Sequence, residues 1–401
     1  MKKILLLWIG FCIFFCSCKS IWNVVKAIDY ALTEDRMSKK TEITYYYGEK
    51  RPFVFEKSIF IPCKINDIEH LLLYDSGITD DFLELIPGNA KFPKKCKTMK
   101  QTMGTSSTRV TVEMGLKYCN IESDFFNFKK FITTIMSVSS DTVTLKCISG
   151  IHGYYLGMYA FPKRKNTMLL NFSDTTITLL DSIDRYDTAN FMLVKSFFSN
   201  GATIRVYLTI DSVEYGFLFD TGSNGFLSLS QHEKHKKEND VAMAGFVTID
   251  ASGIVIDTSI IQQANTIIMG NLDSIKGTVD YKTKLTSPIM GMKFISNFDW
   301  IIDRYRKEIY AKKIKDIEYE DIVPNGYRVD AFDTTLQISL LPVGETEYQL
   351  FSIIDSVNGE KVNTDNICQM RELLNKRNGF KDNKIVILPL PKIDLLSEPR
   401  F

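Results

Sequence analysis

One short pattern occurs twice in this chain, 145 residues apart, and it constrains the fold more than any other feature. Asp75-Ser76-Gly77 and Asp220-Thr221-Gly222 each follow an apolar run. The similarity extends upstream, because Ile61–Gly77 aligns with Val206–Gly222 without a gap, with matching isoleucine, glutamate and apolar positions. A match of this length indicates a duplicated structural unit.

Each copy is predicted to form a β-hairpin that delivers an aspartate to a loop. Apolar residues alternate along the first half of each segment, a polar pair follows (Asn66-Asp67 or Asp211-Ser212), and a buried strand then runs to the aspartate. Both copies are rich in β-branched and aromatic residues, with turn-forming clusters about every 8 to 12 positions, as in all-β proteins. We therefore expect a mainly β chain.

A second landmark repeats downstream of each aspartate. Ile151-His152-Gly153 and Ile289-Met290-Gly291 are predicted to be equivalent elements, with Gly153 corresponding to Gly291. Closing strand pairs are predicted after them, at 168–180 and 300–313. Between aspartate and glycine, each copy has an alternating segment that includes glycines (103–118 and 244–261), for which a hairpin over a cleft and ordinary sheet are both possible, with ordinary sheet favoured.

The first 18 residues are predicted to be an export signal. Two lysines precede an apolar stretch that is too short for a membrane span. Cys18 follows the apolar stretch and a small residue, an order that resembles a bacterial lipobox. The resemblance implies an exported protein of the bacterial cell envelope, periplasmic or surface-facing, held to the membrane by a lipid on Cys18. The alternative is an ordinary cleaved signal peptide.

Composition excludes several classes of function. The 49 basic and 48 acidic residues balance to a net charge of +1, which gives no reason to expect a nucleic-acid partner. His232 and His235 form an isolated HxxH pair in a polar segment, so no metal or other cofactor is predicted. No GxSxG motif for a serine hydrolase occurs. The five cysteines after Cys18 include no CxxC pair, and they are interpreted as buried free thiols.

The pattern changes after about residue 323. Strands are predicted at 327–342, 351–362 and 384–391, with a helix at 364–377 that Thr364 or Asp365 would cap. The order of these elements, with Val357-Asn358-Gly359 at the turn, resembles the second half of a bacterial PDZ domain. The resemblance implies a small α+β domain at the C-terminus.

The duplicated region resembles the pepsin and retropepsin superfamily of aspartic proteases, on the strength of the two Asp-Ser/Thr-Gly triplets and the hydrophobic-Gly elements. The resemblance implies two six-stranded β-barrel-like lobes in a bilobal arrangement. It also implies a water held between Asp75 and Asp220, and a peptide or protein substrate in the cleft between the lobes. Both copies lie in one chain, so a monomer is expected. Ser223, after the second glycine, also fits the family pattern.

The triplets also make chemical sense by themselves. Two adjacent carboxylates cannot both ionise easily and so share a proton, and aspartic proteases are the standard example of this behaviour. One carboxylate can then accept a proton from water while the other donates to the scissile carbonyl. Glycine allows each loop to approach the other closely. The hydroxyls of Ser76 and Thr221 are expected to bond across the two loops and fix the carboxylates.

Two hypotheses of function follow, with a third less favoured. The first is an aspartic-type endopeptidase that uses Asp75 and Asp220. The second is a catalytically inactive lipoprotein that keeps the fold and binds peptide or protein segments, and a purely structural scaffold is the third. Ile78 in place of a hydroxyl residue, the acidic Asp80 and Asp81, and His152 are departures that favour the second.

The sequence thus predicts five successive parts. A signal peptide (1–18) precedes a tether (19–42) that contains a short helix at Ile21–Leu32. The two lobes follow at 43–187 and 188–322, and the PDZ-like domain occupies 323–401.

Overall fold

The duplicated region folds into two closed β-barrels with the same strand order. The structure is a computed structural model, and it describes residues 18–78, 82–87, 90–94, 96–104, 109–138, 147, 153–161, 167–199, 203–230, 240–250, 253–272, 274–316, 326–332, 334–376 and 378–388. The first barrel consists of β4 (Ile59–Ile65), β5 (Ile68–Asp75), β6 (Phe82–Pro87), β8 (Arg109–Ser123), β9 (Phe126–Val138) and β10 (Tyr154–Gly157). The second consists of β15 (Ile204–Ile210), β16 (Val213–Phe219), β17 (Leu227–Ser230), β19 (Gly253–Ile268), β20 (Ile275–Lys282) and β21 (Ile289–Met290).

Strand pairing in the two barrels is equivalent throughout. The first barrel closes in the order β8-β4-β5-β10-β6-β9-β8 and the second in the order β19-β15-β16-β21-β17-β20-β19. Even the parallel pairs correspond, since β5–β10 matches β16–β21 and β6–β9 matches β17–β20. The fold is therefore mainly β and built by duplication, as the repeat predicted.

Tight turns set the register of the first hairpin in each barrel. Asn66 and Asp67 have φ of 49° and 70°, and Asp211 and Ser212 have φ of 45° and 75°. Two successive left-handed residues form the turn whose twist suits a two-residue hairpin, and Asn and Asp tolerate this conformation. The turns therefore occur at the predicted positions and start both aspartate-bearing strands in the same register.

A six-stranded sheet joins the two barrels. Its order is β13-β23-β22-β11-β12-β2, formed by β2 (Lys50–Pro52), β11 (Thr167–Asn171), β12 (Thr176–Leu180), β13 (Met192–Val194), β22 (Phe298–Asp303) and β23 (Glu308–Lys313). The closing strand pairs predicted for each copy are β11–β12 and β22–β23, and they meet where β11 pairs with β22. One continuous apolar core runs through both barrels and this sheet, with Trp300 fully buried within it.

Polar contacts also link the two copies. Arg304 Nη1 donates to the carbonyl oxygens of Met158 (2.7 Å) and Phe161 (2.9 Å), which lie on and just after a short 3₁₀ helix, η1 (Met158–Ala160). Asp299 accepts from both the amide and the hydroxyl of Ser173. Polar contacts thus join the two copies at the central sheet, in addition to the pairing of β11 with β22.

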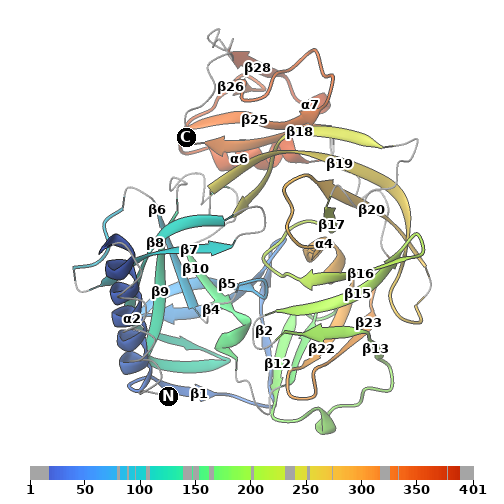
Figure 1. The fold of residues 1–401 in the computed structure, drawn as a ribbon. Coiled ribbons are helices and arrows are strands. Elements are labelled where there is room, and N and C mark those ends of the chain that lie inside the picture. Colours follow the sequence, from blue (N-terminus) through green and yellow to red (C-terminus); the bar gives the residue numbers. More distant parts are fainter. Residues whose placement is uncertain are drawn as a thin grey trace.

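Residues 18–38 form a helix that packs against the first barrel. α2 (Cys18–Ser38) is longer than the Ile21–Leu32 helix predicted from the sequence, since the polar residues after Leu32 continue it. Figure 1 shows α2 alongside β9. Within the part of the chain that the structure describes, no helix has both the length and the apolar character of a membrane span.

The C-terminal unit is a small α+β structure with its own core. It comprises β24 (Arg328–Phe332), β25 (Thr335–Pro342), β26 (Ile353–Val357), β27 (Glu360–Lys361), α6 (Ile367–Asn375), α7 (Gly379–Asp382) and β28 (Ile385–Leu388). The predicted strands and helix are present, but the predicted helix cap is wrong. Asn363 holds the start of the helix, since its Oδ1 accepts from the amides of Asp365 and Asn366.

The remaining elements are strands that extend these sheets and two short helices. They are β1 (Glu42–Tyr45), β3 (Val54–Phe55), β7 (Lys97–Gly104), β14 (Ser196–Phe198), β18 (Val241–Asp250), α4 (Met292–Ile295) and η2 (Ile183–Arg185). β7 with β8, and β18 with β19, form the long hairpins at the two predicted alternating segments. β18 also pairs with β25, so the second barrel and the C-terminal unit share one sheet, as Figure 1 shows at the top of the molecule.

The interpretation of the cysteines was partly wrong. Cys63, Cys96 and Cys119 are free, but Cys147 and Cys368 form a disulfide across 221 residues of sequence. Their pairing depends on the fold bringing α6 against Cys147. The two cysteines are 221 residues apart, and spacing along the sequence does not indicate that contact.

Candidate active site

The two triplets meet at the ends of equivalent strands. Asp75 is the last residue of β5, and Asp220 directly follows β16. β10 lies parallel to β5 and β21 lies parallel to β16, and each supports the strand that carries its aspartate. The duplicated register therefore brings the two loops together as a symmetric pair.

Reciprocal hydrogen bonds bind the two loops to each other. Thr221 Oγ1 accepts from the amide of Ser76 (2.9 Å) and donates to the carbonyl of Tyr74 (2.7 Å). Ser76 Oγ accepts from the amide of Thr221 (3.0 Å) and donates to the carbonyl of Phe219 (2.6 Å). Both hydroxyls are buried, so four backbone groups depend on them for partners. The hydroxyls bond across the loops as the sequence predicted.

Each glycine lies against the carboxyl group of the opposite copy. A Cβ on Gly77 would be 2.7 Å from Asp220 Cγ, and a Cβ on Gly222 would be still closer to Asp75 Cγ. Real Cβ atoms essentially never approach another heavy atom so closely. Glycine is therefore required here for close approach, whichever backbone angles the loop adopts.

The two carboxyl groups are hydrogen-bonded to each other. Burial raises the pKa of Asp75 to about 6, while the amides that follow it and the bond from Asp220 oppose the rise. Burial also raises the pKa of Asp220 well above its usual value, and the neighbouring negative charge of Asp75 raises it further. Gly77 N (2.8 Å) and Gly222 N (3.0 Å) each donate to the carboxylate of their own triplet. Two adjacent buried carboxyl groups whose pKa values are both raised favour a state in which the pair holds one proton.

The surroundings of the two aspartates differ. Ile78 follows the first triplet and packs against an apolar cluster beneath the β7–β8 hairpin, which includes Leu83 and Met136. Ser223 follows the second triplet. The amides of Ile78 and Ser223 both donate to the carboxylate of their own triplet, so the difference lies in the side chains. Tyr155 lies near Asp75, whose negative charge adds to burial in raising the pKa of the phenol. The first aspartate is therefore in the more apolar environment.

Strand register corrects one predicted equivalence. In the first copy, Leu156 lies opposite Tyr74 and Gly157 lies opposite Asp75. In the second copy, Met290 lies opposite Phe219, and Gly291 is the next residue. Gly157 is thus the counterpart of Gly291, and the first hydrophobic-Gly element is Tyr155-Leu156-Gly157.

Gly153 has a different place. It adopts φ of 80° at the start of β10, and its carbonyl accepts from Leu85 N (2.7 Å). The sequence offered both glycines within four positions, and spacing alone could not choose between them.

Several residues named from the sequence lie outside the described residues. They are Asp80, Asp81, His152, His232 and His235.

Two features of the site were not predicted from the sequence, the residue Tyr155 and a bond between Ser58 and Asn224. Tyr155 was hidden by the wrong glycine alignment. The bond from Ser58 Oγ to Asn224 Oδ1 (2.8 Å) joins the start of β4 to the second triplet loop. The sequence contained no signal for that bond, because the two residues are 166 positions apart.

Comparison with protein-family models matched no family, and comparison with curated proteins found no similar sequence. Any assignment of function therefore depends on the geometry of the site.

Proposed function

We propose that this protein is an aspartic-type endopeptidase that hydrolyses peptide bonds with water activated between Asp75 and Asp220. The observation that carries the proposal is the hydrogen-bonded pair of buried carboxyl groups with raised pKa values, held by bonds that cross between two copies of one loop. Such a pair stabilises only one negative charge, and it has one proton available for donation. Both properties are needed for acid–base hydrolysis without a covalent intermediate.

The proposed mechanism follows from where the proton lies. Ionised Asp75 accepts a proton from water as the water oxygen bonds to the carbonyl carbon of the peptide. Asp220 donates its proton to the carbonyl oxygen, which gives a neutral tetrahedral diol. Asp75 then transfers its proton to the amide nitrogen, the C–N bond breaks, and Asp220 recovers a proton from the diol. The pair returns to its starting state with one proton.

Membership of the pepsin and retropepsin superfamily is part of the proposal. The matching order of the two barrels and the central sheet between them support a bilobal arrangement with an extended peptide bound between the copies. A PDZ-like origin is proposed for the C-terminal unit, on its order of strands and helix. Export and lipid attachment at Cys18 stay proposals from the sequence. So do the cell-envelope location and the monomeric state.

A cleavage assay over a range of pH tests the proposal. Purified protein is incubated with a peptide library from pH 4 to pH 8, and products are identified by mass spectrometry. We expect cleavage to rise as the pH passes about 6, because only then does Asp75 ionise while Asp220 keeps its proton. Asp220→Asn should lower kcat by at least about a thousandfold, since it removes the proton donor from the pair.

Asp211→Asn provides a matched control. Asp211 lies in the hairpin turn before Asp220, and its counterpart in the first copy is already an asparagine, Asn66. This variant should retain full activity. Equal cleavage by wild type and Asp220→Asn would assign the activity to another site or to a contaminant.

Peptide binding without turnover is the second candidate function, and the apolar surroundings of Ile78 favour it. A peptide that carries a secondary alcohol in place of the scissile amide separates the two. An active pair should bind this mimic of the tetrahedral intermediate at least about a hundredfold more tightly than the parent peptide. Equal affinities for both would support the binding protein.

A further inference from the structure

The C-terminal unit is attached to both barrel-containing copies, and by different means. β18 of the second copy pairs with β25, with Met243, Ala244 and Gly245 opposite Pro342, Leu341 and Leu340. The amide of Val343 adds a bond to the carbonyl of Ala242 (2.8 Å). Cys147, which follows β9 of the first barrel in the chain, is joined to α6 by the disulfide with Cys368.

The attachment through β18 is closely fitted. Gly245 has φ of 124°, and a Cβ there would lie 2.6 Å from Leu350 Cδ2 and closer still to the carbonyl oxygen of Ser339. A side chain at this position would force the two strands apart. The absence of a side chain at Gly245 thus allows β18 to approach β25 closely.

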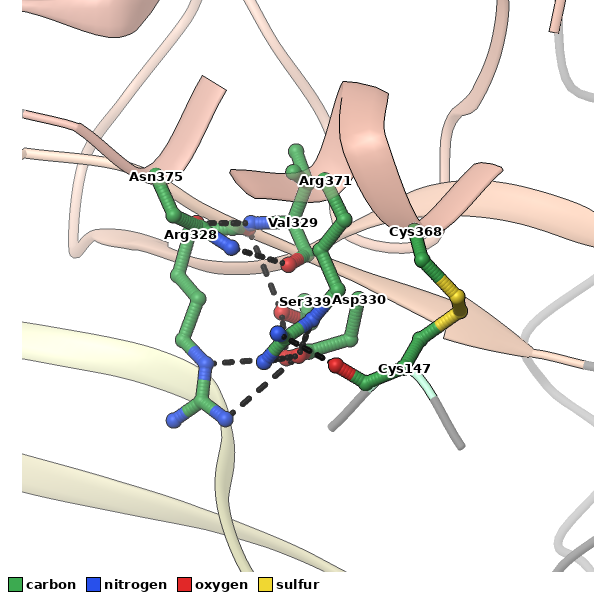
Figure 2. Close-up of polar contacts among 8 residues, drawn as sticks. All are labelled: Cys147, Arg328, Val329, Asp330, Ser339, Cys368, Arg371 and Asn375. Carbon is green, nitrogen blue, oxygen red and sulfur yellow. Dashed lines mark hydrogen bonds and ion pairs between the residues drawn. A yellow bond between two sulfur atoms is a disulfide. The ribbon is translucent and has the colours of Figure 1, made fainter. Parts of the chain in front are cut away.

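Cys147 belongs physically to the C-terminal unit. It is 7% exposed and packs in the apolar core of that unit with Val329, Leu336 and other residues. Its carbonyl oxygen accepts from Arg371 Nη1 (2.8 Å). Figure 2 shows Arg371 between Cys147 and Asp330.

A buried ionic group fixes Arg371 in that orientation. Arg371 Nε and Nη2 both lie 2.8 Å from Asp330 Oδ1, and the Asp330 carboxylate is fully buried. Ser339 Oγ (2.6 Å) and Arg328 Nε (2.9 Å) bind the other carboxylate oxygen. The bonds to Asp330 fix the plane of the guanidinium, so that Nη1 donates to the carbonyl of Cys147.

A side chain of α6 also occupies the edge of β24. Asn375 Oδ1 accepts from the amide of Val329 (2.9 Å), and Asn375 Nδ2 donates to its carbonyl (2.8 Å). These are the two backbone groups that an added strand would use at this point of β24. Cys368, Arg371 and Asn375 are three and four residues apart, so α6 presents all three on one face (Figure 2).

We propose that the C-terminal unit binds within its own chain, to β18 of the second copy and through Cys147 to the first, and we call this arrangement the bracket. The Cys147–Cys368 disulfide stabilises the bracket, and reduction by a dithiol releases it. The chain between β23 and β24 already tethers the unit to the second copy, and in the oxidised protein the disulfide adds a second tether that raises the effective concentration of β25 near β18. Reduction leaves the chain connection, the β18–β25 ladder and the buried contacts of Cys147. The β18–β25 contact then opens far more often.

The release step is a thiol–disulfide exchange with a dithiol, either a small molecule or a redox protein. A thiolate of the dithiol attacks Cys368 Sγ, the more exposed of the two sulfurs, and Cys147 leaves as a thiolate. The second thiol of the reagent then displaces Cys368 from the mixed disulfide. Two cysteine thiols and one oxidised dithiol result, and the two protons of the reagent end on Cys147 and Cys368.

Hydrogen exchange measured by mass spectrometry on the full chain tests the bracket. The oxidised protein, the protein reduced with dithiothreitol, and a Cys147→Ser/Cys368→Ser double variant are compared. We expect the amides at 242–245 and the amide of Val343, which bonds the carbonyl of Ala242, to exchange at least about tenfold faster in the second and third samples. Amides of β4, β5, β15 and β16 should not change.

Cys96→Ser is the matched control, since Cys96 is a free cysteine outside the bracket. In its oxidised form it should keep the slow exchange of the wild type. Unchanged exchange at 242–245 after reduction would overturn the proposal. Faster exchange throughout β26 and β28 would also overturn it, because the disulfide would then stabilise the unit itself and not its attachment. Neither readout depends on peptidase activity, so failure of the proposed function would leave this test intact.

Discussion

The two triplet loops have nearly the same backbone and different surroundings. Both are held by the same four crossing hydrogen bonds, and both put a glycine against the opposite carboxyl group. Around them, the first copy has Ile78 and Tyr155 where the second has Ser223 and Ile289. Duplication supplied a symmetric frame, and later substitution made the two environments unequal.

The difference shows how one frame can give two carboxyl groups separate roles. Two identical sites would leave the shared proton equally placed on either side. Here Asp75 is 9% exposed in a more apolar setting, yet the bond it receives from Asp220 opposes the rise of its pKa. Asp220 has the additional effect of a neighbouring negative charge, which raises its pKa further. The two carboxyl groups thus have raised pKa values for partly different reasons.

Replacing the glycines should have the largest effect, because it breaks the symmetric frame itself. Gly222→Ala puts a methyl group against Asp75, and Gly77→Ala puts one against Asp220. Each should lower kcat/KM by more than about a hundredfold, since a displacement of about 1 Å at reacting groups has an effect of this size. Gly222→Ala should be the more harmful, because its contact is the closer. Steady-state kinetics on a peptide identified from the library would measure both.

Gly225→Ala is the control for these variants. It lies in the same loop as Gly222, but a Cβ there has no neighbour nearer than Ser223 Oγ at 3.7 Å. It should keep activity within about twofold of the wild type. A Gly222→Ala protein with full activity would show that the loops can separate without loss of function.

Removing the crossing hydroxyls should have the next largest effect. Ser76→Ala leaves the amide of Thr221 and the carbonyl of Phe219 without their partner, and Thr221→Val does the same to Ser76 and Tyr74. Each variant should lower the free energy of unfolding by about 1–3 kcal/mol, because the groups left unpaired are buried. Urea titration would measure the loss.

The paired hydroxyls also predict non-additivity. The double variant should lose less stability than the sum of the two single variants, since both act on one network. Ser76→Thr and Thr221→Ser keep the hydroxyls and should restore most of the stability. Additive losses without rescue would mean that packing, and not the crossing bonds, accounts for the effect.

The symmetric part of the site was predictable from sequence, and the asymmetric part was not. A fixed offset of 145 residues relates the two triplets, with their aspartates, hydroxyl residues and glycines. The offset is constant here because the backbone and its contacts are the same in both copies. The equivalence of Gly157 and Gly291 was missed because the chain between aspartate and glycine differs in length between the copies. Cys147–Cys368 and Ser58–Asn224 join distant segments through tertiary contacts, which no local pattern records.

The shared proton should also appear in stability as a function of pH. Both carboxyl groups have raised pKa values in the folded protein, so the contribution of each to stability is fully present below about pH 4 and falls as the pH rises, for Asp75 through about 6 and for Asp220 higher still. Asp75 titrates in both proteins, so the wild type should lose more unfolding free energy than Asp220→Asn as the pH rises from about 4 to about 7. Urea titrations across this range would measure the difference.

Asp211→Asn again serves as the control, and its stability should follow the wild type at every pH. A wild type that gains stability relative to Asp220→Asn as the pH rises would contradict raised pKa values for the pair.

The smallest effect is expected from making the first copy resemble the second. Ile78→Thr introduces a hydroxyl beside Asp75 while keeping a β-branched side chain. A donor that bonds the ionised carboxylate lowers its pKa. The acid limit of activity should therefore move below about pH 6, by less than about one pH unit, and kcat at neutral pH should change little. Ile78→Val keeps the site apolar and should leave the limit in place. If Ile78→Thr raised the limit or left it unmoved, the apolar side chain after the first triplet would not contribute to the raised pKa of Asp75. That rise would then originate in burial by other residues, among which Tyr155 lies near Asp75.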